Sequence, residues 1–416
     1  MSPRRFPACL SWALLSAACG GGGASSVPSP AAPASQTPAS GPNVLPVTVD
    51  AGPVPGQTAY NIVFTSVTVC VPGTSSCQTI PEVQVDTGSS GLRLLSSALT
   101  LNLPAVTGPT QHALAECLQY SDSSNWGTVK RADVHLAGEQ ALSLPVQVIG
   151  DPSVPTVPSA CTSGGFPTTD TLASLGTNGV LGVGNLIQDC GVACTFSGAA
   201  NPGLYYECSS KTQCQPVAVS LAQQVQNPVA LFASDNNGIV LQLPAVATEA
   251  TSLQGSMIFG IGTQANNGLG SAVVFTFDAN GYFTTLFAGK SLPYSFIDSG
   301  SSAIAFPDPS VATCSDLQNS LFCPSSSLNF SATNQGTNGS QSTVAFTVSN
   351  ADQLFTQFPN GTAFAPLGAP ALVTQAGAPN GPGSFDWGLP FFFGRSVFSA
   401  IEGQPTPAGP GPYVAY

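Results

Sequence analysis

The sequence predicts an all-β fold made of two similar lobes. From Val44 onward, short apolar runs are interrupted about every ten residues by Gly, Pro, Asn and Ser, which is the pattern of strands joined by turns. Helix-like periodicity is confined to two brief stretches, 216–225 and 351–355. A five-residue motif occurs twice, as DTGSS at 86–90 and as DSGSS at 298–302, so each copy fits within a lobe of its own.

Four segments show the strand pattern most clearly. They are rich in β-branched and aromatic residues, and turn residues bound or interrupt them, so we expect strands joined as hairpins. These segments are NIVFTSVTVC (61–70), ALSLPVQVIG (141–150), GSMIFGIG (255–262) and AVVFTFDANGYFTTLFAG (272–289).

The first 19 residues have the features of an export signal. Two arginines precede an apolar stretch at 6–18, which is shorter than the ~20 apolar residues of a transmembrane helix. The sequence LSAAC at 15–19 resembles a bacterial lipobox, in which Cys19 is lipidated, although its leucine lies one position further from the cysteine than usual. Cleavage by an ordinary signal peptidase is the alternative. Residues 20–43 are uncharged and rich in Gly, Ser, Pro and Ala, which predicts a flexible tether.

We therefore expect an exported protein, either lipid-anchored to the bacterial outer membrane or free in the periplasm or the medium. The chain has 8 basic and 20 acidic residues, a net charge of -12, and loss of the two signal arginines leaves 6 against 20, or -14. Nucleic acid is excluded as a partner because phosphate binding needs clustered basic residues. The only histidines are His112 and His135, so imidazole-based metal sites and triads are poorly supplied. We expect a monomer without metal or cofactor that contacts a membrane only through the lipid.

The cysteines predict disulfide bonds. Ten remain when Cys9 and Cys19 are set aside, and an even number in an exported chain favours disulfides over metal thiolates. A zinc cluster formed by the four cysteines between positions 190 and 214 is the competing interpretation. Spacing, with elimination for the last pair, suggests Cys70 with Cys77, Cys190 with Cys194, Cys208 with Cys214, Cys314 with Cys323, and Cys117 with Cys161.

Asp86 and Asp298 stand at the same place in the two motif copies, where an apolar strand ends. A single copy would more simply be a turn nucleated by Asp, but the duplication favours a paired site. Two carboxylates brought face to face cannot both ionise and therefore share a proton. The ionised one takes a proton from water, and the other donates to a substrate carbonyl oxygen. Glycines that let backbone N–H groups reach the carboxylates, and hydroxyls that donate to them, support the pair: Thr87, Gly88, Ser89, Ser299, Gly300 and Ser301.

These motifs resemble those of the pepsin-like, two-lobed aspartic peptidases. VDTGSS at 85–90 and IDSGSS at 297–302 resemble the family's two active-site motifs. GVLGVG at 179–184 and WGLPFFF at 387–393 resemble the apolar segment with glycine that passes behind each active-site loop. The four motifs occur in the family's order and span most of the chain. The resemblance implies a two-lobed β-barrel architecture with pseudo-two-fold symmetry and a cleft between the lobes.

The family also has a hairpin flap that carries a tyrosine over the substrate, and the segment 117–138 resembles it, with Tyr120 in the tyrosine's place. A tryptophan usual after the first motif is replaced by Arg93, and Trp126 within the flap could compensate for it or obstruct the site. Arg93 close to a carboxylate pair would lower its pKa values. The cysteine-rich segment 189–216 has no counterpart in the resemblance and is expected to be a stapled insertion near the cleft.

The resemblance implies an aspartic endopeptidase that hydrolyses peptide bonds of a peptide or protein substrate through activated water. The alternative is a catalytically inactive surface binding module on the same scaffold. A serine hydrolase is disfavoured because the sequence lacks a Gly-x-Ser-x-Gly elbow before a helix. The expected divisions are the signal at 1–19, the tether at 20–43, the N-terminal lobe with the flap and insertion at 44–262, and the C-terminal lobe at 263–416.

Overall fold

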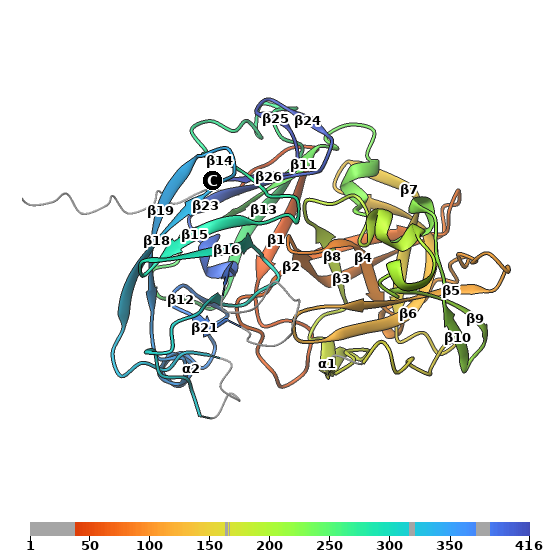
Figure 1. Ribbon diagram of the computed structural model, residues 1–416, viewed down its shortest axis with the longest axis horizontal. Helices are drawn as coiled ribbons and strands as arrows, with labels where there is room; N and C mark the ends of the chain where they lie inside the picture. The colour runs from red at the N-terminus through yellow and green to blue at the C-terminus, as the bar shows by residue number, and fades with distance from the viewer. Residues whose placement is uncertain (1–37, 163–164, 166, 316–320, 372–382) are drawn as a thin grey trace, which may run out of the picture. The chain divides into compact units, whose positions relative to one another are not determined.

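The structure is a computed structural model that describes residues 38–162, 165, 167–315, 321–371 and 383–416. The predicted signal, Cys19 and most of the predicted tether lie outside these residues. Strands dominate the regular structure, which confirms the all-β fold (Figure 1). The helices of the described chain are α1 (Leu172–Leu175) and α2 (Ala351–Gln357). Its 3-10 turns are η1 (Ser96–Ala98), η2 (Gly191–Thr195), η3 (Gly198–Ala200), η4 (Leu221–Gln223), η5 (Pro228–Leu231) and η6 (Leu389–Phe391).

The larger sheet has 15 strands and contains the first copy of the motif. In order of pairing, its strands are β10 (Gln213–Pro216), β9 (Tyr205–Ser210), β5 (Ala113–Gln119), β6 (Ser124–Leu136), β7 (Glu139–Ile149), β4 (Ser90–Leu95), β8 (Gly179–Val183), β3 (Cys77–Asp86), β2 (Val63–Cys70), β1 (Val44–Val49), β13 (Leu253–Phe259), β11 (Gly238–Leu243), β23 (Arg395–Ala400), β26 (Tyr413–Ala415) and β14 (Val274–Thr276).

Part of this sheet closes on itself. Strand β6 pairs with β2 as well as with β5 and β7, so β2, β3, β8, β4, β7 and β6 form a barrel. Strands β4 and β8 are buried at every position, because each has neighbours on both edges and packing on both faces. Their continuous apolar sequence is the form expected of a strand without a solvent face.

The second sheet has seven strands and contains the second copy of the motif. Its interior is aromatic: the rings of Phe306 and Phe385 stack with centroids 5.5 Å apart, and Trp387 Nε1 donates to Asn334 Oδ1 at 2.9 Å. In order of pairing, the strands are β19 (Gln341–Val348), β18 (Leu328–Gln335), β15 (Phe283–Phe287), β16 (Lys290–Ile297), β22 (Ser384–Trp387), β17 (Ile304–Phe306) and β21 (Gly368–Pro370). Two small pairs are β12 (Glu249–Ala250) with β20 (Ala363–Phe364), and β24 (Pro405–Thr406) with β25 (Gly409–Pro410).

Strands from both predicted lobes meet in the larger sheet. Strand β1 pairs with β13, and β11 pairs with β23, so early and late parts of the chain are hydrogen-bonded neighbours. One apolar cluster includes Val85 and Leu181 from the first motif's surroundings and Ile297 and Trp387 from the second's. The core therefore continues beneath both motifs. The predicted boundary at 262/263 follows β13 directly and stays a prediction.

One of the two helical expectations is wrong. The stretch 351–355 lies in α2, whose first turn is capped by the Asn350 side chain accepting from Gln353 N at 3.0 Å. The stretch 216–225 is mostly irregular, since Pro216 is the last residue of β10 and only Leu221–Gln223 form a further element, η4. Its backbone is bound by other segments, since Val219 N donates to Cys194 O at 2.9 Å. Those long-range bonds replace the bonds that a helix would have made within the stretch.

The ten cysteines from Cys70 to Cys323 form five disulfides, and their pairing is the one that the spacing predicts. The four cysteines of the alternative zinc cluster are bonded in two of these pairs. The bridges are Cys70–Cys77, Cys117–Cys161, Cys190–Cys194, Cys208–Cys214 and Cys314–Cys323.

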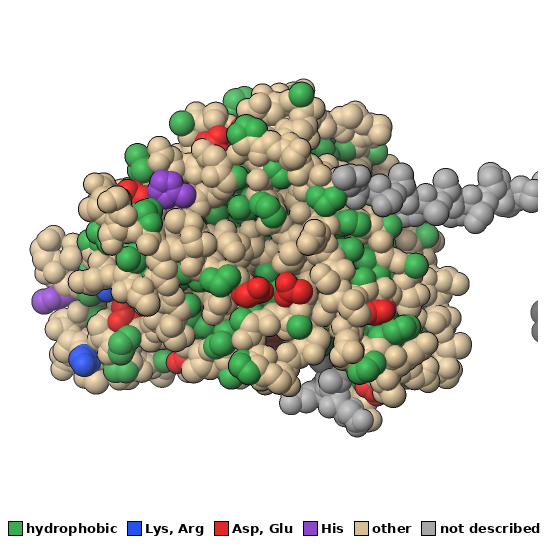
Figure 2. Space-filling model, turned by 180° about the vertical axis from the view of Figure 1, so that it is seen from behind, with side chains coloured by type: hydrophobic (Ala, Val, Ile, Leu, Met, Phe, Trp, Pro, Cys, Tyr) green, Lys and Arg blue, Asp and Glu red, His purple; other side chains and the backbone are tan. Residues whose placement is uncertain are grey.

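Much of the visible surface is uncharged and polar. On the face shown in Figure 2, backbone and uncharged polar side chains cover most of the area, and Lys and Arg are sparse. None of the helices in the described ranges has the length and hydrophobicity needed to cross a bilayer.

Candidate active site

The two motif copies sit in equivalent arrangements of three strands. Strand β3 ends at Asp86, the loop turns through the motif, and β4 begins at Ser90. Strand β8 lies between β3 and β4, parallel to the first and antiparallel to the second. In the second copy, β22 lies in the same way between β16 and β17. The two motif copies therefore share one strand arrangement, as the duplicated architecture inferred from the repeated motif requires.

The two aspartates lie face to face, and the glycines of the motifs make the close approach possible. A Cβ on Gly88 would lie 2.5 Å from Cγ of Asp298, and a Cβ on Gly300 would lie 2.7 Å from Oδ1 of Asp86. Neither glycine has a positive φ. Both positions therefore require glycine because a side chain would collide with the opposite aspartate, and not because the backbone is left-handed.

Each carboxylate is held by its own loop. Gly88 N donates to Asp86 Oδ1 at 2.7 Å, and Gly300 N donates to Asp298 Oδ1 at 2.7 Å. The hydroxyl of Ser89 donates to Asp86 Oδ2 at 2.5 Å. These bonds are the ones that the motif predicts for its glycines and hydroxyls, and they fix both carboxyl groups against rotation.

Reciprocal hydrogen bonds join the two loops. Ser299 N donates to Thr87 Oγ1 at 2.9 Å, and Thr87 N donates to Ser299 Oγ at 3.1 Å. Both side chains are buried, and Ser299 Oγ also donates to Val85 O at 2.8 Å. The bracing predicted for the motif hydroxyls is thus present, and it sets the distance between the carboxylates.

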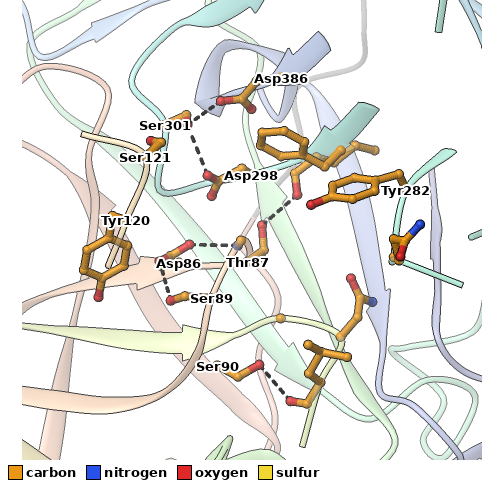
Figure 3. A pocket seen from close by; sticks show the side chains of 18 of the residues that line it. Asp86, Thr87, Ser89, Ser90, Tyr120, Ser121, Tyr282, Asp298, Ser301 and Asp386 are labelled. Carbon is orange, nitrogen blue, oxygen red and sulfur yellow. Dashed lines mark hydrogen bonds between the residues drawn. The ribbon is translucent and has the colours of Figure 1, made fainter. Parts of the chain in front are cut away.

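Ser301 connects the pair to a third carboxyl group that the sequence reasoning missed. Its hydroxyl lies 3.1 Å from Asp298 Oδ2 and 2.6 Å from Asp386 Oδ2 (Figure 3). One hydroxyl has one proton, so Ser301 can donate to only one of the two at a time. A protonated Asp386 satisfies both contacts, because it donates to Ser301 while Ser301 donates to Asp298.

The surroundings favour protonated carboxyl groups here. Burial raises the pKa of Asp298 well above its ordinary value, and the charges of Asp86 and Asp386 and a hydrogen bond with Asp86 raise it further. Burial raises the pKa of Asp386 to about 8, with a smaller contribution from the charge of Asp86, although the hydrogen bond from Ser301 opposes the shift. One proton shared by Asp86 and Asp298 is the state that these shifts support.

These shifts predict that Asp298 and Asp386 stabilise the folded protein more in acid than at neutral pH. A carboxyl whose pKa is higher when folded than when unfolded binds its proton more tightly in the folded state. Its contribution to stability is complete below the ordinary value of 3.8 and is lost as the pH rises toward the folded value, about 8 for Asp386. We expect the melting temperature measured by calorimetry to fall across this range. Asp386→Asn should weaken the dependence of the melting temperature on pH, whereas Asp170→Asn, at an exposed position, should leave that dependence unchanged. The same pH dependence in both variants would contradict the raised pKa of Asp386.

Tyr120 lies over one side of the pair, at the tip of the hairpin formed by β5 and β6. Its backbone N–H donates to Ser123 O at 2.8 Å, which closes the turn, and its hydroxyl is buried without a hydrogen-bond partner among the described residues. Figure 3 shows Tyr120 and Tyr282 on opposite sides of the carboxylates. Trp126 neither replaces the missing tryptophan nor obstructs the site, because its Nε1 donates to Val154 O at 2.7 Å in a separate cluster.

The cysteine-rich insertion covers the outer edge of this hairpin. Strand β9 pairs with β5, and β10 pairs with β9, so β6, β5, β9 and β10 form a continuous sheet. The disulfide Cys117–Cys161 ties β5 to the loop after β7, and Cys208–Cys214 ties β9 to β10. The expected stapled insertion near the cleft is therefore part of the same sheet as this hairpin.

Arg93 is fully buried and paired with two carboxylates. Its Nη2 donates to Glu116 Oε1 and to Asp189 Oδ2, both at 2.9 Å. Tyr205 also donates to Asp189, at 2.7 Å from Oδ1. The guanidinium is thus neutralised locally, and the pKa of Asp298 is raised, contrary to the lowering expected from Arg93. The cluster instead joins β4 and β5 to the insertion, which contains β9.

The carboxylates open into a cleft of about 760 Å³. It is lined by both motifs, by Tyr120 and by Tyr282, and it contains no Lys, Arg or His among its described lining residues. Its acidic lining residues are Asp86, Asp189, Asp278, Asp298, Asp386 and Glu402. Among the described residues, Cys314, Cys323 and Asp352 have potential metal-ligand atoms within 4.8 Å of one another, but the two cysteines form a disulfide, so this group does not suggest a metal centre.

The structure brings together every residue proposed for the site from the sequence. Asp86 and Asp298 form the centre, their predicted supporting residues make the contacts described, and Tyr120 lines the same cleft. Sequence reasoning missed Asp386, as well as the partners Glu116 and Asp189 of Arg93. One feature of the sequence could have pointed to Asp386. It directly precedes the apolar segment 387–393, which was expected to pass behind the second motif and therefore close to Asp298.

Similarity to known proteins extends over nearly all of the described chain. A family described as "Protein of unknown function (DUF3443)" matches residues 39–416. Among solved structures, the crystal structure of aspartic proteinase from Irpex lacteus is similar, with a TM-score of 0.48 and 13% identity over 89% of this chain and 96% of that chain. No curated protein matches. The chain belongs to the DUF3443 family.

Proposed function

We propose that this protein is an aspartic endopeptidase in which Asp86 and Asp298 share one proton and activate a water molecule. The observation that carries the proposal is the pair itself: two facing carboxylates, each fixed by its own loop, at the base of a cleft. One carboxylate accepts a proton from the attacking water. The other donates its proton to the carbonyl oxygen of the scissile peptide bond, so the tetrahedral intermediate forms without a covalent bond to the enzyme.

The proposed mechanism requires the pair to hold one negative charge. Activity should therefore fall once the pH exceeds the upper apparent pKa of the pair, a value that belongs to both groups together. Because the pKa of Asp298 is raised, this limit lies higher than it would for an isolated carboxyl. The cleft volume of about 760 Å³ leaves room for several peptide residues, and Tyr120 lines this volume.

The decisive experiment is hydrolysis of a mixed peptide library by the purified chain from about pH 2 to 8, analysed by mass spectrometry. We expect cleavage with an acid optimum and inhibition by a statine-type transition-state mimic, whose hydroxyl stands in for the attacking water. A folded protein that cleaves none of the library and does not bind the mimic would contradict the proposal. The binding-module alternative would then account for the cleft.

A further inference from the structure

We propose that Glu116 and Asp189 are positioning residues for Tyr120, and that they act only while their two carboxyl groups share one proton. They act through Arg93, with which they form a buried group called here the Arg93 cluster. This inference rests on the proposed peptidase function and adds a pH-sensitive element to the same site. It starts from a count of charges: one guanidinium faces two carboxyl groups, so full ionisation leaves one uncompensated negative charge in the interior.

The two carboxyl groups of the Arg93 cluster meet at one nitrogen atom. Arg93 Nη2 lies 2.9 Å from Glu116 Oε1 and 2.9 Å from Asp189 Oδ2, and the exposed fractions of the three side chains are 0, 0 and 2%. Neither carboxyl group has a second cation within ion-pair distance among the described residues. Tyr205 donates to Asp189 Oδ1 at 2.7 Å, which adds a hydrogen bond but no positive charge. The cluster is therefore neutral only when one carboxyl group is protonated.

The charge of the cluster changes with pH in a definite direction. The titratable groups that face Asp189 are Glu116 on β5, Arg93 on β4 and Tyr205 on β9. Burial raises the pKa of Asp189 well above its ordinary value, and Glu116 raises it further through its charge and a hydrogen bond, against the opposing effects of Arg93 and Tyr205. The proton is thus kept in acid and passes to the solvent as the pH rises through the raised pKa.

The cluster is connected to Tyr120 through β5. Glu116 and Tyr120 are four residues apart, an even spacing that places two side chains of an extended chain on the same face. The hydroxyl of Tyr120 is shielded from solvent and has no partner among the described residues, and the same is true of Arg93 Nε and Glu116 Oε2. The charges of Arg93, Glu116 and Asp189 all act on this hydroxyl, whose pKa is raised first of all by burial. A donor, an acceptor and a hydroxyl that can be both are thus gathered behind Tyr120.

A second negative charge should displace the tip of the β5–β6 hairpin without unfolding it. The hairpin stays attached at any pH, because β5 pairs with β9 and the disulfide Cys117–Cys161 ties it to the loop after β7. A buried net charge is costly, so we expect the two carboxyl groups to separate and to move the end of β5 with them. Tyr120 then loses its fixed place beside the carboxylate pair.

Variants that cannot acquire the second charge test the proposal. Asp189→Asn and Glu116→Gln each remove one carboxyl group but keep an oxygen that accepts a hydrogen bond, so the cluster stays neutral as the pH rises. The ratio of kcat/KM at pH 4 to kcat/KM at pH 7 should be smaller in both variants than in the wild type by about 5- to 150-fold, the usual size of a coupling between two sites. Asp122→Asn, which removes the same charge from the exposed tip of the same hairpin, should keep the wild-type ratio. A wild-type ratio in both cluster variants would overturn the proposal.

Hydrogen exchange separates this inference from the proposed function. The amides of residues 117–124 are followed by mass spectrometry, and each rate is divided by the intrinsic rate at the same pH. We expect the wild type to lose protection between pH 4 and pH 7, and Asp189→Asn and Glu116→Gln to keep it. That result would support the positioning role even if no peptide is cleaved. Equal protection of the wild type at both pH values, or an equal loss in both cluster variants, would overturn it.

Discussion

Asp86→Asn and Asp298→Asn are each expected to reduce peptide hydrolysis at acid pH by about 10²- to 10⁴-fold, the usual contribution of a positioned acid or base. Asparagine cannot ionise, so neither variant can hold the single negative charge with which the pair accepts a proton from water. The fold should survive, because an amide oxygen can still accept the loop N–H bonds from Gly88 or Gly300.

The measurement is kcat/KM on the best library peptide, together with the melting temperature of each variant. Asp298→Asn should melt at a higher temperature than the wild type near neutral pH, because it removes a carboxyl that burial and its neighbours keep from ionising easily. Asp170→Asn is the matched control. A variant of the pair that is folded and still hydrolyses peptides at the wild-type rate would exclude the two-carboxylate mechanism.

Arg93→Met is expected to destabilise the protein by about 3–5 kcal/mol, the usual cost of removing one partner from a buried ion pair. The substitution leaves the carboxylates of Glu116 and Asp189 buried and facing each other without a cation. Their repulsion should be greatest at neutral pH. Denaturation by urea, followed by circular dichroism at pH 4 and pH 7, measures the loss and its dependence on pH.

Two further variants test whether charge is the cause. Adding Glu116→Gln and Asp189→Asn to Arg93→Met should restore part of the lost stability, because the unpaired charges are removed. Arg131→Met, at a surface arginine that binds the backbone oxygens of Ser143 and Ala222, should cost at most about 0.5 kcal/mol. If Arg93→Met unfolds at the wild-type urea concentration, the buried cluster is not a source of stability.

The parts of the site that could be predicted are those encoded over a few consecutive residues. Asp86 and Asp298 stand in two copies of one motif, and the glycines and hydroxyls beside them contact the carboxylates through local turns. The disulfide pairing could also be predicted from the sequence, because four of the five bonds join cysteines at most nine residues apart. Local sequence therefore determined both the centre of the site and most of the covalent links.

The parts that could not be predicted depend on which strands become neighbours. Asp386 gains its place only because β22 lies between β16 and β17, and no local pattern marks it as part of the site. Glu116 and Asp189 are 73 residues apart and meet at Arg93 only because the insertion packs against the β5–β6 hairpin. The stretch 216–225 failed as a helix for a similar reason, since distant carbonyl groups bind its N–H groups.

The reciprocal bonds between Thr87 and Ser299 have a consequence for the order of folding. They join residues 212 positions apart, whereas the disulfide that spans the most chain joins residues 44 apart, and no disulfide among the described residues connects the first half of the site to the second. Contacts of such high sequence separation form late, because the entropy of closing a long loop must be overcome first. Oxidation can therefore complete within each half while the aspartates are still apart. We therefore expect the two aspartates to come together only in the last step of folding, and that step to stay reversible after every cysteine has been oxidised.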